Sequence, residues 1–236
     1  MTPRSLLALA ACCCALPAAA LLTRPDRDDA EYLELASRYT SAIPLGARAG
    51  EGVLVSARWI LTAAHRAKAL RDAKAGRVKV GGVDHEIASV HLHPEWSGGA
   101  ANDIALVRLK TDVRGIVPTP VYRGADEGGK AVVIAGHGGG KKRASINTVD
   151  RVEPRALALR IKPLDDASDL QGQATAEETG APAFIQVADE LFVAGILHGT
   201  AGGWETHARV SSFASWVEAT MLEVARQEAE ALLGAS

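Results

Sequence analysis

The sequence is poor in cysteine, and this limits how the folded chain can be held together. Its three cysteines, Cys12, Cys13 and Cys14, are consecutive and lie inside an N-terminal apolar segment. If that segment is removed as a leader near Ala20, the remaining chain has no thiol and forms no disulfide, even in an oxidising compartment. We therefore expect its stability to come from packing alone.

The sequence also lacks the charge pattern of a nucleic-acid-binding protein. The formal net charge is -2, and no block of like charge is longer than Lys141-Lys142-Arg143. We predict no nucleic-acid partner and interpret the basic tripeptide as a solvated loop. With 236 residues and 47% apolar content, the chain is long enough for one or two cores.

The N-terminal segment predicts export. Arg4 precedes an apolar run over residues 5–22, and Ala18-Ala19-Ala20 offers small side chains to a signal peptidase. We expect a signal peptide over residues 1–20 and a secreted or periplasmic protein.

The same segment resembles two other kinds of membrane-directed sequence. The apolar run is short for a membrane span and ends at Arg24-Pro25-Asp26, so we expect no stable membrane span. Leu9-Ala10-Ala11-Cys12 is similar to a lipoprotein cleavage box. A lipoprotein anchored at Cys12 is therefore the alternative to a freely exported chain.

Beyond the leader, short β-type runs are separated by Gly, Pro and Asp turns, which is typical of an all-β barrel or sandwich. The expected strands are residues 53–55, 78–80, 86–92, 104–109, 131–135, 156–161, 183–187, 191–197 and 206–210. In the tail, apolar residues recur at helical spacing, which predicts a C-terminal amphipathic helix over about residues 213–233. Residues 30–38 are ambiguous and compatible with a short helix.

Three residues far apart in the sequence have the types that acyl transfer needs. A hydroxyl nucleophile requires a base to take its proton and an acid group to hold that base in the right tautomer. His65 closes a strand-like run, Asp103 heads a later apolar run, and Thr179 follows further on. The order His, Asp, hydroxyl residue predicts that Thr179 attacks, His65 acts as general base and acid, and Asp103 orients His65.

These residues lie in motifs that resemble the trypsin/chymotrypsin-like serine protease family. Residues 59–65, Trp-Ile-Leu-Thr-Ala-Ala-His, match the motif around the family's catalytic histidine, and residues 102–109 match the motif around its catalytic aspartate. Residues 195–197 and 208–213 resemble the substrate-binding strand and the entry to the C-terminal helix. The resemblance covers about residues 45–217.

The resemblance implies an all-β fold of two six-stranded antiparallel barrels, followed by a C-terminal α-helix. The trypsin-like peptidase domain would span residues 21–236, with barrels at about 40–118 and 121–212. The active site would lie in the cleft between the barrels, where a peptide or protein substrate or ligand binds.

The departures from the family pattern cluster at the reaction centre. The family's Gly-Asp-Ser-Gly-Gly-Pro is replaced at residues 177–182 by Glu-Glu-Thr-Gly-Ala-Pro. The family places the oxyanion hole at the amides of Glu177 and Thr179. Thr179 keeps a hydroxyl, but its methyl group restricts χ1 and crowds an approaching carbonyl. A side chain at Glu177 strains the backbone or rotates the donor away, so we expect impaired catalysis.

The same resemblance supplies further candidates. Arg66 and Gly50 replace a pair of cysteines, so that disulfide is absent. His198 stands where a serine usually supports the catalytic aspartate. The substrate-binding candidates are Gln173 at the base of the specificity pocket, Glu205 at its wall, and His198, Gly199 and Thr200. A polar or acidic pocket favours a basic side chain.

A new N-terminus would compensate for one of these departures. Family members order the oxyanion loop by burying a newly cut N-terminal amine against the acid that precedes the nucleophile. No Ile-Val-Gly-Gly activation site is present, but cleavage after Ala20 leaves Leu21-Leu22 as an apolar N-terminus. We hypothesise that the Leu21 amine pairs with Glu178, because a buried ammonium needs an opposite charge.

Two functions remain open. The first is an exported trypsin-like serine endopeptidase homologue with impaired peptide-bond hydrolysis. The second is a catalytically dead pseudoprotease that binds peptides or another protein through the inter-barrel cleft, and the fold alone does not decide between them. We expect neither a cofactor nor a metal, since His91-Leu92-His93 lacks a third ligand nearby. The oligomeric state stays open.

Overall fold

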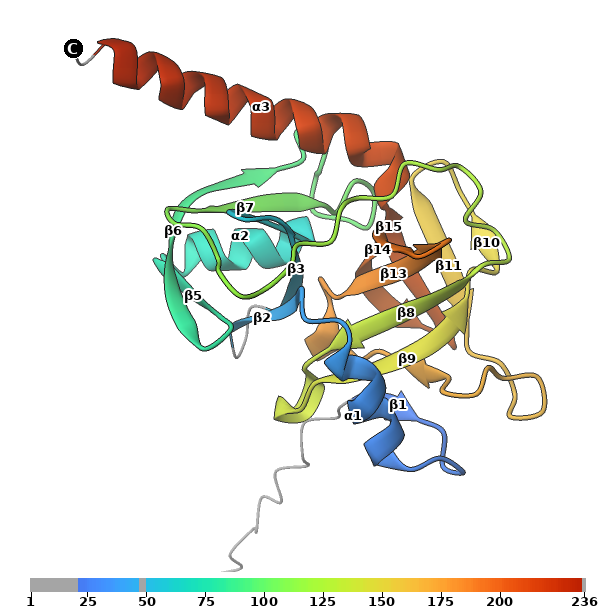
Figure 1. Ribbon diagram of the computed structural model, residues 1–236. Coiled ribbons are helices and arrows are strands. Elements are labelled where there is room, and N and C mark those ends of the chain that lie inside the picture. Colours follow the sequence, from blue (N-terminus) through green and yellow to red (C-terminus); the bar gives the residue numbers. More distant parts are fainter. Residues whose placement is uncertain (1–20, 47–49, 235–236) are drawn as a thin grey trace, which may run out of the picture.

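The computed structural model describes residues 21–46 and 50–234 (Figure 1). The predicted signal peptide over residues 1–20 and the alternative lipid anchor at Cys12 lie outside the described residues. No helix within the described ranges has both the length and the apolar character that a membrane crossing requires. The chain forms two large β-sheets, one from each half of the sequence, and ends in a long helix.

The N-terminal half forms a near-closed barrel of six antiparallel strands. In sheet order these are β2 (Ala42–Gly46), β3 (Gly50–Ser56), β4 (Trp59–Thr62), β7 (Ala105–Leu109), β6 (Val83–Leu92) and β5 (Arg77–Val80). β2 packs against β5, which brings the two edges of the sheet together. Fully buried aliphatic side chains, among them Leu54, Ile60 and Val107, fill the interior.

The C-terminal half forms a sheet that curls into a half-barrel. Its seven antiparallel strands are, in sheet order, β10 (Arg151–Val152), β11 (Ala156–Arg160), β15 (Trp204–Arg209), β14 (Glu190–Ala201), β13 (Pro182–Val187), β8 (Ala131–Gly136) and β9 (Arg143–Thr148). The expected all-β, two-barrel fold with a C-terminal helix is confirmed. The second sheet has seven strands instead of six, since the two-residue strand β10 extends one edge.

A further cluster of buried residues joins the two sheets. Leu61 and Leu106 of the N-terminal barrel share it with Phe184 and Val193 of the C-terminal sheet and with Phe213. Each Å² of apolar surface removed from water between the sheets contributes roughly 25 cal/mol. The two halves are therefore held at a fixed spacing, and loops from both can meet at defined positions.

The start of the described chain is tied to the C-terminal sheet. β1 (Leu22–Thr23) pairs antiparallel with β12 (Gly172–Gln173), and α1 (Asp29–Ser37) packs against β9. Asp28 begins α1 with a capping box completed by Glu31. The short helix allowed by the sequence at residues 30–38 is confirmed.

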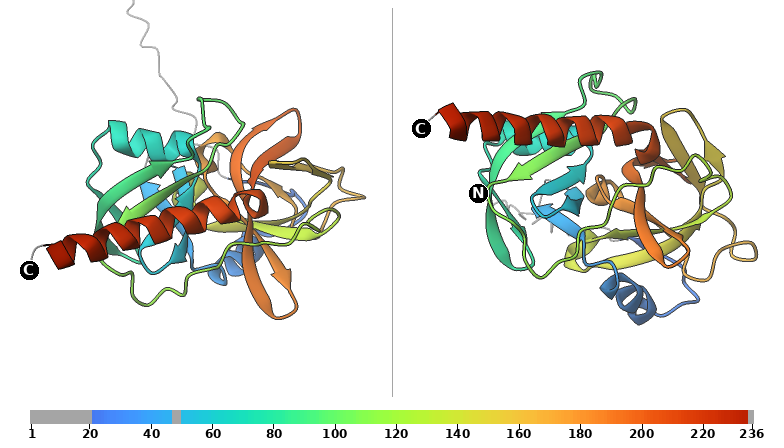
Figure 2. Two further views of the ribbon diagram at one scale, coloured as in Figure 1. Left: turned by 90° about the horizontal axis from the view of Figure 1, so that it is seen from above. Right: turned by 45° about the horizontal axis from the view of Figure 1, so that its top comes forward.

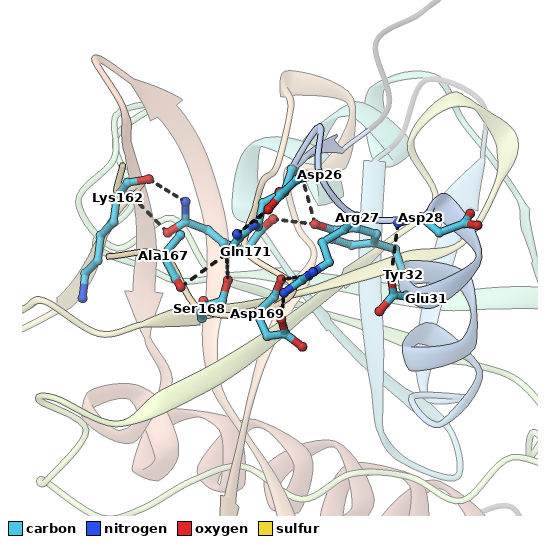
Figure 3. A network of polar contacts seen from close by, with 11 residues as sticks. Asp26, Arg27, Asp28, Glu31, Tyr32, Lys162, Ala167, Ser168, Asp169 and Gln171 are labelled. Carbon is cyan, nitrogen blue, oxygen red and sulfur yellow. Dashed lines mark hydrogen bonds and ion pairs between the residues drawn. The ribbon is translucent and has the colours of Figure 1, made fainter. Parts of the chain in front are cut away.

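Figure 3 shows the polar contacts that fasten this segment to the loop before β12. The buried Tyr32 hydroxyl donates to the carbonyl oxygen of Gln171 at 2.9 Å, and Arg27 donates to the carbonyl oxygen of Asp169 at 3.3 Å. The side-chain amide of Gln171 in turn bonds the backbone of Lys162, donating at 2.8 Å and accepting at 3.1 Å. These contacts therefore hold the chain just after residue 20 in one position against the C-terminal sheet.

Two further helices flank the sheets. α2 (Ala64–Asp72) follows β4 directly, and the sequence pattern did not predict it. α3 (Val210–Gly234) begins at the C-terminal sheet and runs across the N-terminal barrel, as Figures 1 and 2 show. Phe213 is buried near its start, and Glu228 pairs with Arg108 of β7 towards its end.

Candidate active site

Loops from both halves of the chain bring His65, Asp103 and Thr179 together. His65 is the second residue of α2, and Asp103 lies in the loop before β7, so both belong to the N-terminal barrel. Thr179 follows the short 3-10 turn η2 (Ala176–Glu178) and leads into β13 of the C-terminal sheet. The packed interface between the sheets sets the spacing of these loops.

The three side chains form a continuous line of hydrogen bonds. Nδ1 of His65 lies 2.7 Å from Oδ2 of Asp103, and its backbone N–H donates to Oδ1 at 2.9 Å. Nε2 of His65 lies 3.1 Å from Oγ1 of Thr179. Burial alone would raise the pKa of Asp103, but hydrogen bonds from His198 and His65 outweigh it and lower this pKa to about 2. The carboxylate is ionised at neutral pH and holds the His65 ring in one orientation.

A comparison with known families shows to which family the chain belongs. The trypsin family model matches residues 35–158, more than half of the chain. The chain belongs to the trypsin family. The matched segment contains His65 and Asp103 and ends before Thr179. No curated protein matches the chain.

In this trypsin-family chain the Thr179 hydroxyl has a neighbour that the motifs did not reveal, Arg66. Its Nε–H donates to Oγ1 of Thr179 at 2.5 Å, and its Nη2 donates to the carbonyl oxygen of Ala176. Burial lowers the pKa of Arg66, while the charges of Asp103 and Glu51 oppose that shift. A basic residue where the family has a cysteine was the one sequence signal for this contact.

Two acceptors compete for the hydroxyl proton of Thr179. A threonine hydroxyl offers one proton and two lone pairs. Arg66 occupies a lone pair, whereas Nε2 of His65 at 3.1 Å and the carbonyl oxygen of Ala176 at 3.2 Å are both within reach of the proton. Only the hydrogen bond to His65 prepares the oxygen for attack. The resting hydroxyl is therefore divided between a productive and an unproductive partner.

The peptide group between Ala176 and Glu177 has its carbonyl oxygen turned towards Thr179. The C=O and N–H of a trans peptide point in opposite directions, so the Glu177 N–H points away from Oγ1 of Thr179. A capping box between Thr175 and Glu178 holds η2 in this shape. An oxyanion hole needs N–H donors aimed at the developing charge. The Glu177 amide reaches that position only after this peptide rotates.

The substrate-binding candidates fall on three strands of the C-terminal half. They are Gln173 in β12, His198, Gly199 and Thr200 in β14, and Glu205 in β15. Glu205 pairs with Thr200 across the sheet and is fully buried. Its Oε1 accepts from the Ala174 N–H at 2.6 Å, and its Oε2 lies 3.3 Å from Nε2 of His207. The acidic group expected at the pocket wall is thus inside the protein, engaged by its own neighbours.

His198 contacts Asp103, the carboxylate that also binds His65. Its Nδ1 lies 2.5 Å from Oδ2 of Asp103, the same oxygen that His65 approaches. The two imidazole rings meet edge to face, with centroids 5.8 Å apart. Asp103 therefore contacts two imidazoles, and His198 supplies the second contact where the family usually has a serine.

A cavity of about 800 Å³ opens beside Arg66 and Glu177. Glu51 and His137 also line it, together with the turn η1 (Gly138–Gly140). Glu51 is buried. Its Oε1 accepts from the His137 N–H at 3.0 Å, and its Oε2 lies 2.8 Å from Nδ1 of His137. The cavity reaches the site from the side of Glu177, and the substrate-binding candidates are not among its lining residues.

Glu178, the expected partner of a free Leu21 amine, is 1% exposed. Its Oε2 accepts from the Thr175 N–H at 2.8 Å, and its carboxyl group lies against Gly138. Burial raises the pKa of Glu178 to about 7; the Thr175 hydrogen bond opposes this shift and the charge of Glu51 adds to it. Leu21 is also buried, in the core of the C-terminal sheet.

Proposed function

We propose that this chain is an exported serine-type endopeptidase homologue that hydrolyses peptide bonds by acyl transfer at a strongly reduced rate. The observation that carries the proposal is the hydrogen-bonded line from Asp103 through His65 to Thr179. In this mechanism Nε2 of His65 takes the hydroxyl proton as Oγ1 of Thr179 attacks the scissile carbonyl, and then gives it to the leaving amine. Asp103 stabilises the imidazolium that forms between these steps.

Two contacts account for the reduced rate. The guanidinium of Arg66 is bonded to the attacking oxygen, and its positive charge opposes the formation of a second positive charge on His65. The Ala176 carbonyl faces the region where the oxyanion would form. Loss of one oxyanion donor costs about 3 to 4 kcal/mol in a related mechanism. The amides of Glu177 and Thr179 act as donors in the fraction of molecules where the peptide has rotated.

The substrate is a peptide or protein segment held along β14. Gln173 and Thr200 would flank its side chain, with the Glu205 carboxylate beneath them. The Glu205 carboxylate is fully buried and bonded by the Ala174 N–H, so it would favour a basic side chain above it through its charge and not by direct contact.

The second candidate function is peptide or protein binding without turnover. The contacts of Arg66 favour it, because they hold both Thr179 and Ala176 in an unreactive arrangement. In this case the cavity beside Glu177 serves as part of the binding surface.

A phosphonate that reacts with serine hydrolases separates the two functions. We expect slow labelling of Thr179 in the full chain, detected by peptide mass spectrometry, and no labelling of Thr179→Ala. Cleavage of a mixed peptide library should disappear in the same variant. If the parent chain neither reacts nor cleaves, while parent and Thr179→Ala bind the same peptides equally, the binding function replaces the catalytic one.

Removing Arg66 tests the cause of the low rate. We expect Arg66→Ala to label at Thr179 about tenfold faster or more, since a hydrogen bond from a charged donor is worth about 1.5 to 3 kcal/mol. Arg66→Lys keeps the charge but removes the Nε–H, so it separates charge from hydrogen bonding. Melting temperatures show whether each variant is folded. Slower labelling of a folded Arg66→Ala chain would mean that Arg66 assists attack.

Export and processing complete the proposal. A signal peptidase cut after Ala20 would free the amine of Leu21, which directly precedes β1 and its pairing with β12. The amine would then form an ion pair with Glu178, which is buried and has an acid pKa raised to about 7. Mass analysis of the N-terminus of the exported protein identifies the cut directly.

A further inference from the structure

We infer that His65, His198 and Asp103 form a binding site for a divalent transition-metal ion of the zinc type. One ligand atom from each of the three residues lies within 4.8 Å of the other two. The Nδ1 atoms of His65 and His198 lie 2.7 and 2.5 Å from the same carboxylate oxygen of Asp103. This site goes beyond peptide hydrolysis and does not depend on it.

The ligand set suits zinc. Imidazole nitrogen and carboxylate oxygen bind Zn²⁺ at about 2.0 to 2.2 Å, and three protein ligands leave a fourth position for solvent. Tetrahedral geometry at that distance separates ligand atoms by roughly 3.3 Å, so each Nδ1 must withdraw from Oδ2 by less than about 1 Å. The side chains of His65 and His198 are 33% and 30% exposed, which gives both rings room to move outwards.

The charge at the site is compatible with a cation of this class. Asp103 is ionised, and its negative charge attracts a metal ion. Arg66 acts on the same carboxylate and opposes binding. Coordinate bonds from two imidazoles are what distinguish Zn²⁺ from Ca²⁺ and Mg²⁺, which prefer oxygen ligands. We therefore expect selectivity for transition metals.

Other histidine–carboxylate pairs in the chain are the natural comparison. His137 pairs with Glu51, and His207 pairs with Glu205. Within residues 21–46 and 50–234, neither pair belongs to a group of three such ligands. The second imidazole on Asp103, supplied by His198 from the other half of the chain, is what makes this pair a candidate site.

Metal binding changes where the proton of His65 lies. In the hydrogen-bonded line Nδ1–H donates to Asp103, which leaves the Nε2 lone pair facing Thr179. A metal ion bonds to the Nδ1 lone pairs of both His65 and His198, so the Nδ1–H bond of each ring breaks and each proton moves through solvent to Nε2 of the same ring. Both rings stay neutral and no electron is transferred. Because Nε2–H donates and cannot accept, the bound ion removes the general base and inhibits attack reversibly.

Metal binding is measured without relying on turnover. The parent protein of this experiment is the full chain with Thr179→Ala, which removes turnover. It also carries Cys12→Ser, Cys13→Ser and Cys14→Ser, so that thiolates do not bind the ion. We expect one equivalent of Zn²⁺ by calorimetry. Co²⁺ should give the visible absorption of a four-coordinate nitrogen and oxygen site, and Zn²⁺ should abolish that absorption.

Variants at position 198 locate the ion. His198→Asn keeps a donor to Asp103 but has no ring nitrogen, and His198→Ser installs the residue usual in the family. Both should weaken Zn²⁺ binding at least about tenfold, since even the loss of a residue that only supports a ligand costs about 10- to 100-fold. His91→Ser is the matched control and should bind as the parent does. His91 contacts Ser89 and lies outside the ligand group.

The outcomes are decisive in both directions. One equivalent of Zn²⁺ that is lost in folded His198→Asn or His198→Ser, but not in His91→Ser, supports the site. Failure of the parent to bind Zn²⁺, or unchanged affinity in both folded variants at position 198, overturns it. Each result holds whether or not the chain cleaves peptides, because Thr179 is absent from all the proteins compared.

Discussion

Changing Thr179 to serine and Glu177 to glycine together should raise the rate of peptide hydrolysis at least about 100-fold. Serine removes the methyl group that crowds the attacking oxygen. Glycine lets the peptide after Ala176 rotate, so that its N–H can donate to the oxyanion, a contact worth about 100- to 1000-fold. The measurement is kcat/KM on peptides selected from a mixed library.

The single variants divide this gain between its two causes. Thr179→Ser alone leaves the Ala176 carbonyl turned towards the hydroxyl, so we expect a smaller gain. Glu177→Ala, combined with Thr179→Ser, removes the carboxylate but keeps a β-carbon, and it tests whether charge or backbone freedom limits the rate. If the folded double variant Thr179→Ser, Glu177→Gly is no faster than the parent, the low rate has another cause. The hydrogen bond from Arg66 to Thr179 would then be the next cause to test.

Raising the pH from 5 to 8 should remove about 2.5 kcal/mol that Glu178 contributes to the free energy of unfolding of the uncleaved chain. Glu178 has a pKa of about 7 when folded, against an ordinary value of 4.5. The folded state therefore binds a proton more tightly, and this contribution is complete below pH 4.5 and is lost as the pH rises through 7. Each pKa unit corresponds to about 1.4 kcal/mol. Urea unfolding at a series of pH values measures the loss.

The same titration tests the proposed N-terminal ion pair. A chain that begins at Leu21 supplies an ammonium group that favours ionised Glu178, so its stability should fall much less over this pH range. Glu178→Gln should remove this contribution of about 2.5 kcal/mol from the uncleaved chain, whereas Glu177→Gln, at its exposed neighbour, should keep it. Equal losses in the cleaved and uncleaved chains would rule out the pairing of Leu21 with Glu178.

Strands with a strong local signal were predictable from the sequence, whereas strands defined by their partners were not. Each of the expected strands overlaps a strand of the structure, because runs such as that in β8 are rich in Val and Ile. The sequence does not predict β2, since Pro44 and Gly46 interrupt its apolar pattern, or β9, since four of its six residues are polar. The two-residue strands β1, β10 and β12 exist only through pairing with neighbours.

The helix α2 escaped prediction for a related reason. Its N-cap residue is Ala63, which has no side chain to bond the first turn, so the usual start signal is absent. Its helical residues are held by packing, with Ala67 and Leu70 buried against the N-terminal barrel. Local sequence preferences alone do not encode this tertiary contribution.

At the candidate site, motifs identified the residues that the fold brings within hydrogen-bond distance, but not the contacts that modify them. His65 and Asp103 lie in distinctive motifs, and chain order pointed to Thr179. The bonds from Arg66 to Thr179 and the second imidazole on Asp103 depend on side-chain directions in three dimensions. The burial of Glu205 likewise depends on the tertiary fold, which places β15 between β11 and β14 in the sheet.

Because the carbonyl of Ala176 faces Thr179, the rate of hydrolysis depends on the fraction of molecules in which this peptide has rotated. If the alternative backbone arrangement lies about 2.7 kcal/mol higher, one molecule in about a hundred adopts it. The ensemble would then work a hundredfold more slowly than its competent minority, with no triad residue altered. Copies at high concentration would then digest one another more slowly, and a ligand that stabilises the rare arrangement would act as a switch.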